Sequence, residues 1–223
     1  MVDCVAIVSG GMDSVTLIHH LVKNDHLTPA IISFSYGQKH TREIECAKFN
    51  ARDLNCNEHH IVDLTDLNYL FSSSALVSDK VSIPNIKDVK GNPQPPTYVP
   101  NRNMIFLSLA AAYAENIGVS SIYYGAQSHD LYGYWDTTSM FLERLNSVYS
   151  LNRSSAIQIK APFVNYTKAD ILRLGMKINV DYSRTWSCYT GKIKACGNCP
   201  TCAERLNAFS EVGIVDPVEY EQD

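Results

Sequence analysis

A polar, glycine-rich stretch follows the first apolar run of the chain. Residues 9–14 read SGGMDS, after the apolar residues 2–8 and before the helix-like residues 15–22. A strand, a glycine turn and a helix in this order point backbone N–H groups and the positive end of a helix dipole at one place, where a polyphosphate can bind. No Gly-Lys-Ser/Thr follows at Walker A spacing, and an ordinary turn capped by Ser9 or Asp13 is the alternative. The nucleotide-binding candidates are Ser9, Gly10, Gly11, Asp13 and Ser14, of which Asp13 could also approach Mg2+.

Four cysteines near the C-terminus are spaced like the ligands of one metal ion. Cys188, Cys196, Cys199 and Cys202 form a C-x7-C-x2-C-x2-C pattern. Short C-x2-C steps bring thiolates close together, and four soft thiolates select tetrahedral Zn2+. Because four protein ligands leave no open coordination position, we expect a structural zinc that fastens the C-terminal segment onto the body. An iron–sulfur cluster is the main alternative.

Two basic residues stand where each could neutralise a phosphate. Arg102 precedes an apolar helix predicted over residues 104–116, so its guanidinium lies at the dipole end that favours a bound anion. Lys168 falls in the first turn of a helix that Thr167 and Asp170 open at capping-box spacing. A cation is unfavourable there unless it reaches an anion, and phosphate is a plausible target. A solvated Lys168 is the alternative.

Two further polar segments follow predicted strands. The first, SYGQKH at residues 35–40, is expected at the same edge of the sheet as residues 9–14, with a solvated turn and an exposed His40 as the alternative. The second, residues 127–138, carries three aromatic residues and two carboxylates. Aromatic faces stack on a planar ring and carboxylates accept hydrogen bonds from its N–H groups, so this segment could bind such a ring. A packed surface loop is the alternative.

Strands and helices alternate along most of the chain. This order predicts an α/β fold with a doubly wound parallel sheet and right-handed crossovers. Ligands bind beyond the carboxyl ends of such strands, which is where the polar segments lie. The helix over 104–116 is apolar on nearly every side, so we expect it to be sandwiched in the core. The serine- and proline-rich residues 72–100 interrupt the pattern, and we favour a lid for them.

Composition narrows the classes of protein. A chain of 223 residues can form one sizeable core with a small appendage, and we divide it into a nucleotide-binding domain at 1–180 and a zinc-binding segment at 181–223. The net charge of −4 disfavours long nucleic acid as a partner. No run is long enough to span a membrane, and we expect a soluble, cytoplasmic protein. The other three cysteines, Cys4, Cys46 and Cys56, are interpreted as packing or surface thiols.

The spaced motifs resemble one known family. SGGMDS resembles the pyrophosphate loop, SGGxDS, of the N-type ATP pyrophosphatases, which cleave ATP between the α and β phosphates. The set SGGMDS, YGQKH, YVPNRN, NYTKADI, TWSCY and CGNCPTC, with GYWD at 133–136, is similar in order throughout to the 7-cyano-7-deazaguanine synthase family. The resemblance implies an adenine nucleotide alpha hydrolase-like fold, ATP, Mg2+, structural Zn2+ and a homodimer. It also implies conversion of 7-carboxy-7-deazaguanine and ammonia to the nitrile, through an adenylate and an amide.

The resemblance carries roles for individual residues. Residues of the SGGMDS stretch would hold pyrophosphate, and no nucleophilic side chain is required. The catalytic candidates are Arg102, Lys168 and Asp130, and the substrate-binding candidates are Tyr36, Gln38, Tyr134 and Asp136.

One segment departs from the family pattern. The family usually reads D-[FY]-S-G-Y-P-D-C-R where residues 130–138 read DLYGYWDTT. Because this segment is expected to line the acceptor side of the pocket, the amine or the second step could differ. The alternative is a ligase that joins the activated deazaguanine to an N-terminus or lysine of a protein and stops at the amide, in a defence or modification pathway. A non-catalytic nucleotide-binding module is the third hypothesis.

Overall fold

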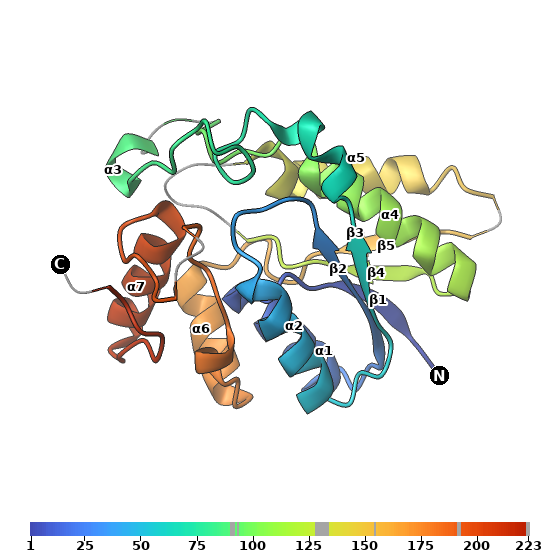
Figure 1. The fold of residues 1–223 in the computed structure, drawn as a ribbon. Coiled ribbons are helices and arrows are strands. Elements are labelled where there is room, and N and C mark those ends of the chain that lie inside the picture. The colour runs from blue at the N-terminus through green and yellow to red at the C-terminus, as the bar shows by residue number, and fades with distance from the viewer. Residues whose placement is uncertain (90–91, 93, 128–133, 154, 191–192, 222–223) are drawn as a thin grey trace.

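The structure is a computed structural model that describes residues 1–89, 92, 94–127, 134–153, 155–190 and 193–221 (Figure 1). Its centre is a sheet of five strands in the order β3-β2-β1-β4-β5, and every pairing is parallel. The predicted doubly wound α/β fold is therefore confirmed. Since β1 pairs with β2 on one side and β4 on the other, the strand order reverses beside β1, and a crevice is expected there. The strands are β1 (Cys4–Ile7), β2 (Pro29–Ser35), β3 (His59–Asp63), β4 (Ser121–Tyr123) and β5 (Gln158–Lys160).

Helices cover both faces of the sheet (Figure 1). One face carries α1 (Met12–Lys23) and α2 (Arg42–Asp53), and the other carries α4 (Arg102–Ile117) and α5 (Ser139–Tyr149). On the α1 side, α6 (Lys168–Lys177) packs against α1, and α7 (Pro200–Val212) packs in turn against α6. This chain of contacts brings the C-terminal segment to the loop that starts α1. The short elements are α3 (Ile86–Val89) and the 3-10 turns Thr65–Phe71, Trp135–Thr137 and Tyr182–Arg184.

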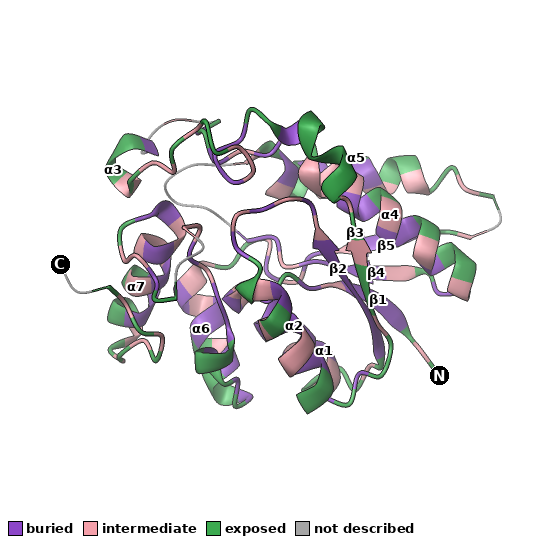
Figure 2. Ribbon diagram, viewed as in Figure 1, coloured by how far each residue is buried: buried purple, intermediate pink, exposed green. Residues whose placement is uncertain are grey.

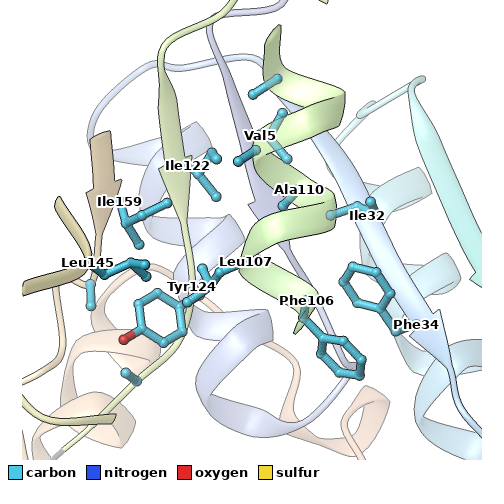
Figure 3. Packing of buried hydrophobic residues seen from close by; sticks show 14 of the residues in the cluster. Val5, Ile32, Phe34, Phe106, Leu107, Ala110, Ile122, Tyr124, Leu145 and Ile159 are labelled. Atoms are coloured by element: carbon cyan, nitrogen blue, oxygen red, sulfur yellow. The ribbon is translucent and has the colours of Figure 1, made fainter. Parts of the chain in front are cut away.

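Aliphatic side chains of the central strands hold the α4 layer on the sheet. Val5, Ile122 and Ile159 point from β1, β4 and β5 toward Leu107 and Ala110 of α4 (Figure 3). All five are no more than 1% exposed. Burial of a side chain of the size of Val, Leu or Ile contributes about 1.5–3 kcal/mol, so this layer fixes the start of α4 relative to the sheet.

The expectation that the helix after residue 103 is enclosed on all sides is wrong. Ser108, Ala112 and Glu115 of α4 are exposed. Figure 2 shows green, exposed segments on this helix. The sheet covers only one side of the helix, and small or polar residues occupy the other. The longest described helix, α4, has 16 residues, and no described helix combines the length and the apolar character that a bilayer crossing requires.

The described part of the segment 72–100 is packed on the body. Ser74, Ala75 and Thr97 are at most 1% exposed, and the Ala75 N–H donates to the carbonyl of Pro96 at 2.7 Å. The Lys39 N–H donates to the carbonyl of Leu76 at 3.0 Å, which joins this segment to the loop after β2. A lid function for it stays a prediction.

Candidate functional site

A cavity of about 250 Å3 lies at the carboxyl ends of the central strands. Its walls come from the loop before α1, the loop after β2, the start of α4, the end of β4 and the C-terminal segment. The structure thus brings together side chains that are far apart in the sequence. The predicted site residues on its wall are Ser9, Gly11, Asp13, Ser14, Tyr36, Gln38, Arg102, Tyr134 and Lys168.

The SGG loop, residues 9–14, presents an uncapped helix end to this cavity. Gly11 is the N-cap of α1, and no side chain of a described residue accepts from the first turn. The Ser14 hydroxyl accepts from the Gly10 N–H at 3.2 Å, and the Ser9 hydroxyl accepts from the Gly11 N–H at 3.2 Å. The alternative of a turn capped by Ser9 or Asp13 is therefore wrong. The first-turn N–H groups of α1 stay available to an anion in the cavity.

Gly10 is fixed by a contact on the other side of the loop. Its φ is +95°, and a Cβ at this position would lie 1.8 Å from the carbonyl oxygen of Glu43 in α2. Gly10 is not part of the cavity wall. Close packing against α2 is thus sufficient to require glycine here, and a contact between Gly10 and phosphate stays a prediction.

We expect Gly10→Ala to destabilise the protein strongly. The left-handed backbone costs about 1–2 kcal/mol for a residue with a Cβ, and overpacking against α2 adds about 1–3 kcal/mol. Urea unfolding of the purified variant measures the sum. Gly118→Ala is the matched control, because Gly118 has φ +74° with nothing within 4 Å of an added Cβ. Equal losses in the two variants would contradict the packing argument.

Lys168 lies between two carboxylates. Its ammonium donates to Asp13 Oδ2 at 3.1 Å and lies 3.5 Å from Glu204 Oε2, with the lysine side chain 14% exposed. Burial by itself lowers the pKa of Lys168, but Asp13 and Glu204 raise it overall, so the group is charged. The alternative of a solvated lysine is wrong. The anions that Lys168 reaches in the structure are carboxylates, so neutralisation of phosphate by Lys168 stays a prediction.

Arg102 and Tyr36 lie together on the cavity wall. The guanidinium donates to the Tyr36 hydroxyl at 3.4 Å. Burial raises the pKa of Tyr36, which keeps the phenol neutral. Gln38 uses its amide to close the turn after β2: its oxygen accepts from the Tyr36 N–H at 2.8 Å and its nitrogen donates to the Phe34 carbonyl at 3.2 Å. Gln38 therefore shapes the wall through the main chain, and direct substrate binding by it stays a prediction.

Tyr134 belongs to the segment that departs from the family pattern and lines the cavity, as Tyr36 does. We call these two aromatic side chains the aromatic wall. The Tyr134 hydroxyl lies 2.9 Å from Thr97 Oγ1, and the Tyr134 ring stacks on Tyr98 at 6.0 Å. Asp136 does not line the main cavity; it is 3% exposed and borders a separate hollow of about 20 Å3 beside Arg102. Burial raises the pKa of the Asp136 carboxyl, and Arg102 opposes that shift. The remaining predicted residue of this segment, Asp130, lies outside the described residues.

Several polar residues on the cavity wall were not predicted as site residues. His40, Glu43, Gln127 and Glu204 all line it. His40 is 3% exposed, so its interpretation as a surface histidine is wrong. No sequence motif marks Glu204, which enters the site because the cysteine segment folds back onto α1. An amphipathic pattern in α2 could have located Glu43, which lies one residue before the buried Ile44.

The four cysteines meet as predicted. The Sγ atoms of Cys188, Cys196, Cys199 and Cys202 all lie within 4.8 Å of one another. A tetrahedral ion with Zn–S bonds of about 2.3 Å requires S···S separations of about 3.8 Å, so the cluster fits such an ion after small adjustments. Backbone N–H groups support the thiolates: Cys196 donates to Cys188 Sγ and Cys199 donates to Cys196 Sγ, both at 3.3 Å.

The cysteine cluster is joined directly to the SGG loop. The Trp186 N–H donates to the carbonyl of Gly10 at 3.0 Å, and the Arg42 guanidinium lies 4.0 Å above the Trp186 ring. Trp186 is 1% exposed and packs beside Cys188. The cysteine cluster and the cavity are therefore parts of one packed unit.

Comparison of the sequence with known protein families identifies the family of this chain. The model of the family described as "Queuosine biosynthesis protein QueC" matches residues 3–213. The chain belongs to the QueC family of queuosine biosynthesis proteins. Membership confirms the resemblance inferred from the motifs and, with it, the classification as an ATP-dependent C–N ligase.

Relatives share nearly the whole chain. A protein of Colwellia psychrerythraea named 7-cyano-7-deazaguanine synthase 1 is 42% identical over 217 residues, which are 97% of this chain and 98% of the relative. A protein of Caldicellulosiruptor saccharolyticus named 7-cyano-7-deazaguanine synthase is 43% identical over 97% of this chain and 95% of the relative. Among solved structures, an NMN synthetase from Francisella tularensis has a TM-score of 0.51 and 14% identity, over 96% of this chain and 73% of that one. The structural likeness concerns the fold alone.

Proposed function

We propose that this chain uses ATP to activate the carboxylate of 7-carboxy-7-deazaguanine and joins it to ammonia, giving 7-cyano-7-deazaguanine through an adenylate and an amide. The observation that carries the proposal is the single cavity in which an uncapped helix end, two cations and aromatic rings converge. The chemistry needs such a site, because hydroxide leaves a carboxylate badly and AMP leaves an acyl adenylate well. A second activation, of the amide oxygen, allows dehydration to the nitrile at the same ATP site.

The SGG loop would hold the pyrophosphate part of ATP. The N–H groups at the start of α1 and the hydroxyls of Ser9 and Ser14 are suited to phosphate oxygens. Arg102 and Lys168, which line the cavity, would neutralise charge that develops on the phosphates and the adenylate. Catalysis would then consist of positioning and electrostatic stabilisation, with no covalent enzyme intermediate.

The deazaguanine would stack against the aromatic wall. Tyr134 and Tyr36 both line the cavity. A planar bicyclic ring between such groups gains contact area and an orientation for its carboxylate. A direct contact with Asp130 belongs to this proposal as well, whereas Asp136 would act on the site only through Arg102, beside which it is buried.

The proposal includes two metal ions, Mg2+ with ATP and Zn2+ at the four cysteines, and the side chains present suit both. Asp13 Oδ1 is buried and has no hydrogen-bond partner among the described residues, and a carboxylate oxygen suits the magnesium that accompanies ATP. The four thiolates suit Zn2+, which would hold the C-terminal segment in place. A homodimer and the division into domains at residue 180 stay predictions.

A second candidate function is ligation to an amine of a protein. Residues 130–138 depart from the family pattern, and Trp135 within them is 45% exposed beside the aromatic wall. An exposed aromatic side chain is a suitable contact for a larger acceptor. In that case the reaction would stop at the amide.

One experiment separates these functions. The purified protein is incubated with ATP, Mg2+, 7-carboxy-7-deazaguanine and ammonium, with and without candidate acceptor proteins, and the masses of all products are measured. We expect the nitrile together with AMP and pyrophosphate. A protein that gains the mass of the deazaguanine acyl group would support the second candidate, and no ATP-dependent change in any species would contradict both.

A further inference from the structure

A buried histidine–glutamate pair lies on one wall of the cavity, at the start of α2. His40 Nδ1 lies 3.1 Å from Glu43 Oε1, and the two side chains are 2% and 15% exposed. Both residues line the same cavity as the SGG loop. The roles proposed for pyrophosphate, adenylate and deazaguanine make no use of this pair.

The geometry leaves one ring nitrogen of His40 available to a ligand. Glu43 faces Nδ1, and the ring of Tyr189 stacks on the imidazole at 6.0 Å. Within the described part of the chain, no hydrogen bond occupies His40 Nε2. The contact between Glu43 and Nδ1 is a short charge contact without the alignment of a hydrogen bond, because His40 Nδ1 has no hydrogen-bond partner among the described residues. A carboxylate this close to Nδ1 still favours the tautomer with its proton on Nδ1, which leaves the lone pair on Nε2 to accept a proton.

Arg102 and His40 both act on the Glu43 carboxyl at this wall. Burial raises the pKa of the Glu43 carboxyl, while His40 and Arg102 lower it. Burial is the largest of these effects, so the pKa of the Glu43 carboxyl is raised overall. The arrangement is that of a histidine base oriented by a carboxylate.

We propose that His40 and Glu43 form the amine subsite of the enzyme, where an ammonium ion or a primary ammonium group binds and gives a proton to His40. His40 is the catalytic residue of this step, and Glu43 is a positioning residue. The inference deepens the proposed function and rests on it, because the acceptor of the freed amine is the acyl adenylate.

The reaction at this subsite transfers one proton to His40 and exchanges a C–O bond for a C–N bond. One N–H bond of ammonium breaks, and its proton passes to His40 Nε2. The freed lone pair forms the C–N bond as the bond between the acyl carbon and the AMP oxygen breaks, and that electron pair leaves with AMP. The surplus proton on the new amide nitrogen and the proton on His40 are then released to solvent.

Two variants and two amines test the subsite. His40→Asn and Glu43→Gln are compared with the unmodified protein in ATP–pyrophosphate exchange dependent on the carboxylate substrate, and in product formation. We expect exchange and the KM for ATP to stay within about twofold, while kcat/KM for ammonium falls by about 100-fold or more, as for loss of a general base. With hydroxylamine, which is largely unprotonated at neutral pH and needs no base, hydroxamate formation should stay within a few fold of the unmodified protein.

The controls keep the outcomes apart. His60→Asn and Glu45→Gln change exposed residues outside the cavity and should alter neither half-reaction. Thermal unfolding shows whether each variant is folded, and Glu43→Gln, which keeps the size of the side chain, serves if His40→Asn is not. Loss of exchange in step with amide formation, or an equal loss with both amines, would overturn the subsite alone. Failure of the unmodified protein to catalyse exchange would overturn the proposed function, and the subsite with it.

Discussion

Replacement of Cys199 by serine is expected to abolish both metal binding and activity. The four Sγ atoms lie within 4.8 Å of one another, so loss of one ligand leaves an incomplete tetrahedral site. A metal bound there would hold two parts of the cavity wall: Trp186, whose N–H donates to the Gly10 carbonyl, and Glu204, which lies 3.5 Å from Lys168. Removal of this constraint should lower the melting temperature by about 10 °C or more, at about 2–4 °C per kcal/mol for a chain of this size.

Metal content, melting temperature and ATP–pyrophosphate exchange measure this result. The matched control is Cys56→Ser, since Cys56 is buried outside the cluster and should keep one metal ion per chain. Removal of the ion by a chelator should reproduce the Cys199→Ser defects in the unmodified protein. A metal-free variant that still catalyses exchange at the normal rate would contradict the coupling between the cluster and the cavity.

Lys168→Met is expected to give the largest combined loss of activity and stability among substitutions in the cavity. The variant leaves the carboxylates of Asp13 and Glu204 without the ammonium that lies 3.1 and 3.5 Å away. Loss of one partner of a buried ion pair costs about 3–5 kcal/mol. Loss of a group that stabilises developing charge reduces the rate by about 100-fold to 1,000-fold.

Urea unfolding and the rate of exchange measure the two effects separately. Lys177→Met removes an exposed lysine from the last turn of the same helix and should change neither. In the double variant Lys168→Met with Glu204→Gln, one unpaired charge is gone, so stability should recover in part while exchange stays low. Recovery of exchange in step with stability would mean that Lys168 acts only through the fold.

The sequence allowed the fold, the glycine turn before α1 and the meeting of the four cysteines to be predicted because their signals are local. The order of strand, glycine turn and helix defines residues 9–14, and the cysteine spacing alone predicts the metal cluster. Capping also follows from neighbouring residues: Thr167 and Asp170 form the predicted box, with the Thr167 hydroxyl accepting from the Asp170 N–H at 3.1 Å.

Long-range contacts could not be predicted in this way. Lys168 is buried because Glu204, 36 positions later by their sequence numbers, reaches the same cavity from α7. Gly10 is required by the carbonyl of Glu43, which belongs to a different helix. Asp136 was expected on the substrate side from its place in a motif, yet the 3-10 turn at Trp135–Thr137 buries it beside Arg102. In each case the tertiary packing decides the role of the residue, and no short pattern records it.

Because Trp186 donates a hydrogen bond to Gly10, the cavity can be completed only late in the synthesis of the chain. The ribosome makes the SGG loop first, but residues 186–204 complete its surroundings only after most of the chain has been translated. A nascent polypeptide therefore carries the loop without Trp186, Lys168 or Glu204 around it. Such a fragment has no assembled pocket, so unfinished chains should not consume ATP.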